Sequence, residues 1–199
     1  MNLPFSQACE NNKQPILDVL QRVFVGRRQI LEIGSGTGQH ATFFAPQLAP
    51  AIWQTSDRAD NHQAINAWLT ERPAANLRAP LVLDVDMAQW PTEGVVDAVF
   101  TANTCHIMAW SSVENMFAGL SVTLAVGGVL AIYGPFNYDN QYTSESNVRF
   151  DSWLKAQALH QGIRDFGAVN DQASAAGMAL LEDNTMPANN RLLVWLKTR

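Results

Sequence analysis

The sequence predicts an α/β fold with a mostly parallel sheet, and three observations support this. Short apolar runs typical of strands alternate with amphipathic helical segments along most of the 199 residues. The runs are nearly continuously apolar, as expected for strands that helices cover on both faces. A glycine-rich segment, Gly34–Gly38, follows the first run and leads into a helix. In α/β sheets this type of strand–helix junction commonly binds ligands.

The elements of the first two thirds follow from periodicity. The first predicted helix, Lys13–Phe24, places its apolar residues on one face, and Pro15 fits its first turn. The predicted strands are Gln29–Ile33, Ala51–Ser56, Leu81–Leu83, Val95–Ala102 and Val129–Tyr133. The helices predicted between them are a segment from about Gln39, Asn61–Glu71 and Ser111–Leu124. Ser111 and Glu114 have the spacing of a capping box.

The last third of the sequence does not continue the alternation of strands and helices. Arg149–Leu159 and Phe166–Ala176 have helical periodicity. Met178–Thr185 and Arg191–Lys197 resemble strands, and the short link between them has the spacing of a hairpin. We therefore expect seven strands with a C-terminal antiparallel hairpin.

Composition narrows the class of protein. Lys and Arg number 13 and Asp and Glu number 18, so the net charge is −5. This balance argues against a nucleic-acid binder and against a polybasic membrane patch. No signal peptide or membrane span is expected, so we predict one cytoplasmic domain over residues 1–199. Cys9 and Cys105 can form a disulfide in principle, but thiols stay reduced in the cytoplasm, so we expect two free cysteines. Charged residues are only 16%, which raises the question of a homodimer.

Three carboxylates are expected at the edge that carries the glycine loop. Glu32 lies inside the first strand, Asp57 follows the second, and Asp84 follows the third. The carboxyl ends of parallel strands share one edge of the sheet, where ligands bind. A carboxylate after the second strand suits the two hydroxyls of a ribose.

The loop does not fit two common nucleotide motifs. The dinucleotide fingerprint is G-x-G-x-x-G, and Gln39 stands at its last glycine. The Gly-Lys-Ser/Thr of an ATP-binding P-loop is missing. An NAD(P)-dependent oxidoreductase is therefore a weaker alternative.

The sequence ILEIGSGTG from Ile30, Asp57, and LDVD from Leu83 resemble the motifs of class I S-adenosylmethionine (SAM) methyltransferases. The resemblance covers about Lys13 to Lys197 and implies a Rossmann-like fold. The chain is most similar to a small methyltransferase-like family of bacteria and animals that has a domain of unknown function. The motifs of this family are Asn12-Lys13-x-Pro-Ile, Asn103-Thr104-x-His-Ile, Tyr133-Gly-Pro-Phe, Thr143-Ser-Glu-Ser-Asn, Phe150-Asp-x-Trp-Leu and Met186-Pro-Ala-Asn-Asn.

The resemblance implies a role for each matched position. The backbone of Gly34, Ser35, Gly36, Thr37 and Gly38 holds the methionine portion of SAM. Glu32 supports its ammonium group directly or through water, and Asp57 binds the ribose. Asp84 and the Val85 backbone meet the adenine, and Asn103 and Thr104 lie near the transferred methyl. Independently of the resemblance, an acidic pocket complements the positive charges of SAM.

Simpler roles remain open for the acids. Glu32 can pair with Arg27 or Arg28. Asp57 can cap the following helix. Asp84, and more so Asp86, can be turn residues.

His106 is the candidate general base, because it lies just past the fourth strand, where the methyl group should point. A structural histidine bonded to a carbonyl is the alternative. Asn103 is the second predicted catalytic residue. No metal site is expected, since no His, Cys, Asp or Glu spacing fits one.

A small molecule is the expected substrate. The DNA-methyltransferase element [DN]-P-P-[YF] is replaced by Asn103-Thr104-Cys105-His106. The longest stretch without periodicity is Asn137–Asn147, and long loops often carry binding groups. The predicted substrate-binding residues are Asn12, Lys13, Phe136, Asn137, Tyr142, Asn147 and Arg149. Arg149 and Arg164 suit a carboxylate or phosphate, with surface salt bridges as the alternative.

The sequence thus predicts a SAM-dependent methyltransferase that methylates a small molecule at O, N or S and releases S-adenosylhomocysteine. A module that binds SAM or S-adenosylhomocysteine without turnover is the second reading, because fold does not guarantee activity.

Overall fold

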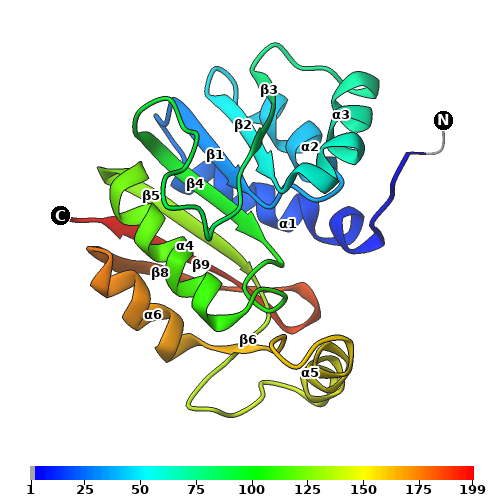
Figure 1. Cartoon of the computed structure of the whole chain (residues 1–199), viewed down its shortest axis with the longest axis vertical. Coiled ribbons are helices and arrows are strands. Elements are labelled where there is room, and N and C mark those ends of the chain that lie inside the picture. Colours follow the sequence, from blue (N-terminus) through cyan, green and yellow to red (C-terminus); the bar gives the residue numbers. More distant parts are fainter. Residues whose placement is uncertain (1–2) are drawn as a thin grey trace.

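The computed structural model describes residues 3–199 and contains the predicted sheet of seven strands, in the order β3-β2-β1-β4-β5-β9-β8 (Figure 1). The first two residues of the predicted 1–199 domain lie outside the described residues. The strands are β1 (Gln29–Ile33), β2 (Ile52–Asp57), β3 (Leu77–Val82), β4 (Val96–Ala102), β5 (Leu124–Gly134), β8 (Met178–Met186) and β9 (Asn190–Lys197). Strand β9 pairs antiparallel with β5 and with β8, and the other pairs are parallel. The α/β fold and its C-terminal hairpin are therefore confirmed.

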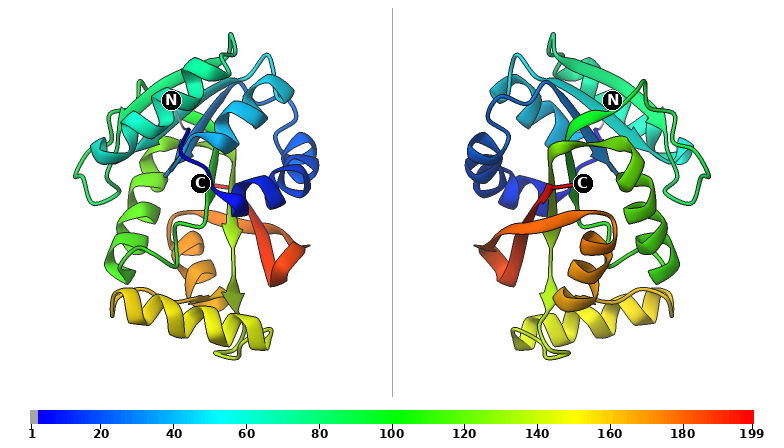
Figure 2. Two further views of the ribbon diagram at one scale, coloured as in Figure 1. Left: turned by 90° about the vertical axis from the view of Figure 1, so that its right-hand side faces the viewer. Right: turned by 90° about the vertical axis from the view of Figure 1, so that its left-hand side faces the viewer.

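Helices cover both faces of the sheet, as predicted. Helices α1 (Gln7–Val23) and α2 (Gln39–Gln47) lie on one face, with α3 (His62–Glu71) packed against α2. Helices α4 (Trp110–Thr123) and α6 (Phe166–Ala175) lie on the other face (Figure 2). Helix α5 (Glu145–Gln157) crosses the end of the sheet.

The apolar strands serve two cores at once. In β1, Ile30 packs into the core beneath α1 and α2, and Leu31 packs into the core beneath α4 and α6. In β4, Phe100 packs into the core beneath α1 and α2, and Val99 packs into the core beneath α4 and α6. Side chains alternate across a strand, so a strand buried on both faces must be apolar throughout. This explains the continuous apolar runs in the sequence.

Four elements begin four or more residues before their predicted start, and β5 is one of them, at Leu124 rather than residue 129. Strand β3 spans Leu77–Val82 rather than 81–83, because an edge strand tolerates the Arg78 and Pro80 that broke the apolar run. Helix α1 begins at Gln7 rather than residue 13, since the Ser6 side chain accepts a hydrogen bond from the Cys9 amide.

Helix α5 begins at Glu145 rather than residue 149. The Ser144 side chain caps it by accepting from the Asn147 amide, so a polar segment that reads as loop is the first helical turn. The predicted loop is shortened further by β6 (Phe136–Asn137), which pairs with β7 (Arg164–Asp165) in an unpredicted two-stranded sheet.

The predicted capping box at α4 is wrong. The helix begins at Trp110, its N-cap is Ala109, and no side chain caps it. Ser112, one residue further on, instead donates to Asp86 at 2.8 Å. The start of α4 is thus held by a contact with the loop after β3 rather than by its own sequence.

Cys9 and Cys105 are both free thiols, so the alternative that they pair is not realised. Burial raises the pKa of the Cys105 thiol to about 11. Within residues 3–199, no helix combines the length and apolar character that crossing a membrane requires.

Candidate active site

Two cavities meet at the carboxyl ends of the parallel strands. The first has a volume of about 520 Å³. We call it the acidic chamber, and its defining residues are Gly34, Gly36, Asp57, Asp84, Asp86 and Thr104. The second has a volume of about 620 Å³. We call it the amide chamber, and its defining residues are Asn11, Asn12, His106, Tyr133, Asn147 and Asn190. Asn103 and Ile107 line both chambers and mark their junction.

The glycine loop between β1 and α2 forms one wall of the acidic chamber. Gly34 and Gly36 have φ angles of 71° and 59°, a conformation that favours glycine. A Cβ on Gly34 would lie 2.7 Å from Thr104 Cγ2, whereas a Cβ on Gly36 would meet open space. Gly34 therefore allows the loop to close on β4, and Gly36 leaves its backbone accessible from the chamber. Ser35, Thr37 and Gly38 do not line the chamber.

Asp57 ties the loop to the end of β2. Its Oδ2 accepts from the Gly36 amide at 2.7 Å, and its Oδ1 accepts from the Arg58 amide at 2.7 Å and Asn61 Nδ2 at 2.8 Å. The residue is only 7% exposed and lines the acidic chamber. Helix α3 begins after Asn61 without a side-chain cap, so Asp57 is not its cap.

Glu32 lies behind the loop rather than in the chamber. Its carboxylate is 1% exposed, and one oxygen accepts from both Ser35 Oγ (2.8 Å) and Trp53 Nε1 (3.1 Å). Arg27 donates instead to the Gly127 carbonyl, so the simpler role as a partner of that arginine does not apply. Arg28 makes its contact through its backbone amide, with the Asp97 carboxylate. Burial raises the pKa of Glu32 to about 7.

Replacing Glu32 with glutamine is expected to flatten the pH dependence of stability. The folded protein holds this proton up to about pH 7, whereas the ordinary pKa is 4.5. This difference in pKa makes the free energy of unfolding depend on pH. The contribution of Glu32 is fully present below pH 4.5 and is lost as the pH rises to about 7, by about 3 kcal/mol in all. Glutamine keeps an oxygen for Ser35 and Trp53 but does not titrate.

The check is urea unfolding of both proteins at about pH 5 and pH 8, with exposed Glu114→Gln as the matched control. The wild type and the control should lose stability between these values, and Glu32→Gln should lose less. Equal losses in all three proteins would mean that Glu32 titrates at its ordinary value.

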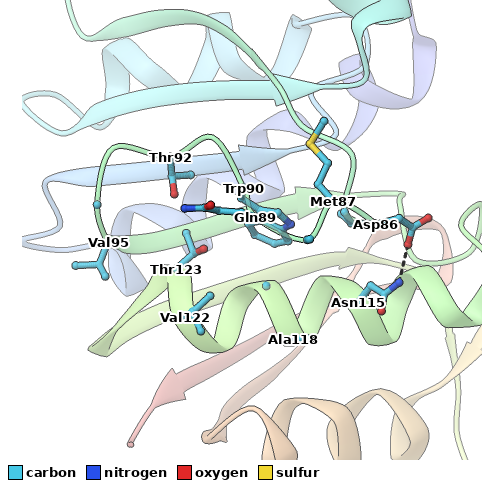
Figure 3. A pocket seen from close by; sticks show the side chains of 14 residues that line it. Asp86, Met87, Gln89, Trp90, Thr92, Val95, Asn115, Ala118, Val122 and Thr123 are labelled. Carbon is cyan, nitrogen blue, oxygen red and sulfur yellow. Dashed lines mark hydrogen bonds between the residues drawn. The ribbon is translucent and has the colours of Figure 1, made fainter.

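The turn after β3 closes the far side of the acidic chamber. Asp84 accepts from the Asp86 amide at 3.1 Å, and its carboxylate is 3.8 Å from Arg58 Nε. Asp84 is thus a turn residue that also lines the chamber, beside the buried Val85. Asp86 also lines the chamber and accepts from Asn115 of α4 at 2.9 Å, as Figure 3 shows. The turn is therefore anchored to a helix.

Figure 3 also shows a third cleft, on the other side of this turn, between residues 85–95 and α4. Trp90 fills its floor and packs directly on Gly119, where a Cβ would lie 2.3 Å from the indole ring. This packing fixes the loop that carries Asp84 and Asp86.

Asn103 and Thr104 form the boundary at the end of β4. Asn103 has a φ angle of 59°, which asparagine tolerates better than most residues, and its amide donates to the Tyr133 carbonyl at 2.8 Å. Thr104 is buried, and its hydroxyl lies 2.7 Å from that of Thr101. Residues held in this uncommon conformation concentrate at functional sites.

His106 faces the amide chamber. The residue is 6% exposed, and its ring meets Phe150 edge-on at 5.3 Å between centroids. Within residues 3–199 its ring nitrogens have no hydrogen-bond partner, so the alternative of a histidine bonded to a carbonyl is not observed. Burial, aided by the positive charge of Arg164, lowers the pKa of His106 to about 4. The imidazole is therefore neutral at pH 7 and able to accept a hydrogen bond.

Of the predicted substrate-binding residues, Asn12 and Asn147 line the amide chamber. Lys13 lies outside both chambers, because its ammonium group pairs with Glu10 and sits 4.9 Å from the centre of the Phe43 ring. Of the two residues predicted from the Asn12-Lys13 motif, only Asn12 therefore lines the amide chamber.

Four further predicted residues also lie outside both chambers. Phe136 is buried in the core, and Asn137 is 9% exposed within β6. The Tyr142 hydroxyl donates to Asp151, and Arg149 is an exposed residue 3.8 Å from Glu145. None of the four lines either chamber, and Asn137 Oδ1 is buried without a hydrogen-bond partner among residues 3–199.

Arg164 is not available to hold an anion. Its guanidinium donates to the carbonyls of Cys105, Met108 and His160. These bonds fix the turn that carries His106, so Arg164 has a structural role.

The prediction missed several residues of the two chambers. They include Arg58, Met108 and His160 in the acidic chamber, and Tyr133 and Phe150 in the amide chamber. The last two belong to family motifs quoted above, which was the available signal. No periodicity indicates that these motifs meet in space.

Known structures resemble the chain in fold. An O-methyltransferase family protein from Burkholderia thailandensis superposes with a TM-score of 0.82 at 16% identity, over 94% of this chain and 56% of that one. An O-methyltransferase family 2 protein from Planctomyces limnophilus in complex with apigenin gives 0.81 at 17% identity, over 96% and 58%. The S-adenosylmethionine-dependent methyltransferase SibL gives 0.79 at 16%, over 96% and 56%.

The fold is therefore the Rossmann-like fold of methyltransferases, and the chain spans little more than half the length of these three proteins. A family model built on sequence also matches nearly the whole chain, and it fits the predicted family with a domain of unknown function. On the match of residues 3–197, the chain belongs to the family described as "Protein of unknown function (DUF938)".

Proposed function

We propose that this protein is a SAM-dependent methyltransferase that acts on a small molecule. The observation that carries the proposal is the pair of chambers that share Asn103 and Ile107 at the carboxyl ends of the strands. One chamber suits a cationic cofactor and the other a neutral acceptor. The methyltransferase fold of the chain and of its structural neighbours supports the same assignment.

The residues of the acidic chamber fit SAM. Three carboxylates line it with one guanidinium, so its charge complements a ligand that carries a sulfonium and an ammonium group. Ligands with several phosphate groups, such as NAD(P), would be repelled by the excess negative charge of this chamber. Ile33, Leu83 and Val85 supply an apolar wall for a purine ring, and the open face of Gly36 allows close approach.

SAM, when bound, supplies a methyl group on a sulfonium and leaves as the neutral thioether S-adenosylhomocysteine. We assign the ribose to Asp57, the adenine to Asp84 and Val85, and the methionine portion to the backbone of Gly34 and Gly36. Glu32 acts indirectly, since it holds Ser35 beneath the loop.

Asn103 and His106 act at the junction. A leaving group that departs neutral needs no proton, so orientation of the acceptor is the main task. Asn103 lines both chambers and can orient the acceptor toward the acidic chamber. The neutral His106 ring accepts a hydrogen bond from the acceptor's O–H or N–H and so helps to orient it, while its lowered pKa makes it a weak general base.

The experiment that tests the function is calorimetry of the purified protein with SAM, S-adenosylhomocysteine and NADH. We expect dissociation constants of about 1 μM for the two adenosyl ligands, or about −8 kcal/mol, and no binding of NADH. Binding of NADH alone would refute the proposal. Tight SAM binding without methyl transfer to any component of a cell extract would favour a binding module instead.

A further inference from the structure

We propose that the amide chamber takes an uncharged, ring-containing molecule that offers both hydrogen-bond donors and acceptors. This inference rests on the proposed function and specifies its acceptor. Asn11, Asn12, Asn103, Asn147 and Asn190 all line this chamber. They come from α1, the end of β4, α5 and the start of β9, so four separate segments place amide groups around one space.

The amide groups present both kinds of hydrogen-bonding atom. The Oδ1 of Asn12 accepts from His40 Nε2 at 2.7 Å, so its Nδ2 is the donor that this side chain presents to the hydroxyl of Tyr133, which also lines the chamber. The Nδ2 of Asn147 donates to Thr143 and to the hairpin tip, which leaves its Oδ1 as an acceptor. Asn190 likewise donates its Nδ2 to a hairpin carbonyl and keeps its Oδ1. These internal bonds fix the side chains before any ligand binds.

The chamber offers no counter-charge. Among residues 3–199, its lining contains no Lys, Arg, Asp or Glu side chain. Nearby cations are already paired, since Lys13 contacts Glu10 and Arg191 contacts Asp183 at 2.7 Å. A carboxylate, phosphate or ammonium group would lose its hydration without gaining a partner. A neutral polar ligand avoids this penalty and exchanges its water contacts for amide contacts.

One wall of the chamber is aromatic. Phe150 lines it and meets the His106 ring edge-on, and Trp153 stacks on Phe150 at 5.8 Å with an interplanar angle of 12°. Ile107 and Pro135 extend this apolar wall. A flat ring can pack against the wall while its polar substituents meet the asparagines opposite.

The test uses three probes of nearly equal shape: benzamide, benzoate and benzamidine, which are neutral, anionic and cationic. Binding is followed by NMR on the isotope-labelled full chain, with and without S-adenosylhomocysteine. We expect benzamide to bind with a dissociation constant of about 1 mM, ordinary for a ligand of this size. The charged probes should bind about tenfold more weakly or worse, and the shifts should centre on Asn147 and His106.

A charge variant sharpens the test. Asn103→Asp keeps a residue type that tolerates the positive φ angle and adds a carboxylate to the chamber. It should reverse the preference so that benzamidine binds about tenfold better than benzamide. Gln21→Glu adds the same charge on the exposed side of α1 and should leave the order unchanged. Should Asn103→Asp fail to fold, Asn147→Asp replaces it.

Each outcome decides the inference. Benzoate or benzamidine binding to the wild type as tightly as benzamide would overturn it, as would no benzamide binding in the millimolar range. Calorimetry with SAM is read separately. If SAM binds but benzamide is not preferred over the charged probes, only the inferred class of acceptor is contradicted. If SAM does not bind, the proposed function itself is contradicted.

Discussion

Replacing Asp57 with alanine is expected to weaken SAM binding by about 100-fold and to destabilise the fold. The carboxylate accepts three hydrogen bonds in the free protein, from Gly36, Arg58 and Asn61. Hydrogen bonds to a charged group contribute about 1.5–3 kcal/mol each. Alanine removes the assigned ribose acceptor and also the contact that holds the glycine loop against β2. A loss of about 3 kcal/mol in binding corresponds to about 100-fold in affinity.

Calorimetry measures the affinity, and urea unfolding measures the stability of the same samples. Asp60→Ala is the matched control, because Asp60 is three residues away and its side chain is 88% exposed. The control should change neither quantity beyond about 0.5 kcal/mol. Unchanged SAM affinity in Asp57→Ala would show that the ribose assignment is wrong.

Replacing Gly34 with alanine is expected to destabilise the protein by about 2–4 kcal/mol. Two effects add: the φ angle of 71° is strained for alanine, and its Cβ would lie 2.7 Å from Thr104 Cγ2. The loop must move away from β4 to relieve the overlap, and this movement should also weaken SAM binding.

The double variant Gly34→Ala, Thr104→Ser separates the two effects. Serine lacks the Cγ2 atom but keeps the hydroxyl that contacts Thr101. The double variant should recover part of the lost stability, leaving about 1 kcal/mol for the strained φ angle. A double-mutant cycle on unfolding free energies measures the coupling. Strictly additive losses would mean that the two side chains do not meet.

The sheet was predictable because its signal is local. Buried strands such as β1 and β4 are apolar on both faces, and the helices between them have a regular apolar period. The acids at the strand ends followed from the same pattern, since parallel strands share one edge. Strand β3 was misplaced because its residues are only partly buried, which weakens the apolar signal. The start of α5 was missed because polar capping residues resemble a loop.

The amide chamber was predictable only in part. Asn12 and Asn147 line it, but Arg149 does not, although it is only two residues from Asn147. Neighbouring helical residues face different directions, and which one faces inward depends on packing between distant segments. The hairpin tip and α5, for example, meet through Asn189 and Ser146, which are 43 residues apart. No local pattern encodes such a contact.

The two chambers have different structural origins, and this has a consequence for divergence within the family. The acidic chamber is built mainly from strand ends and their turns, which the sheet fixes. The amide chamber is completed by α1, α5 and the hairpin tip, all of which lie over the sheet edge. Changes in these covering segments can alter the acceptor while the donor side stays intact. Under the proposed function, the architecture therefore allows acceptor specificity to change independently of the residues assigned to the cofactor.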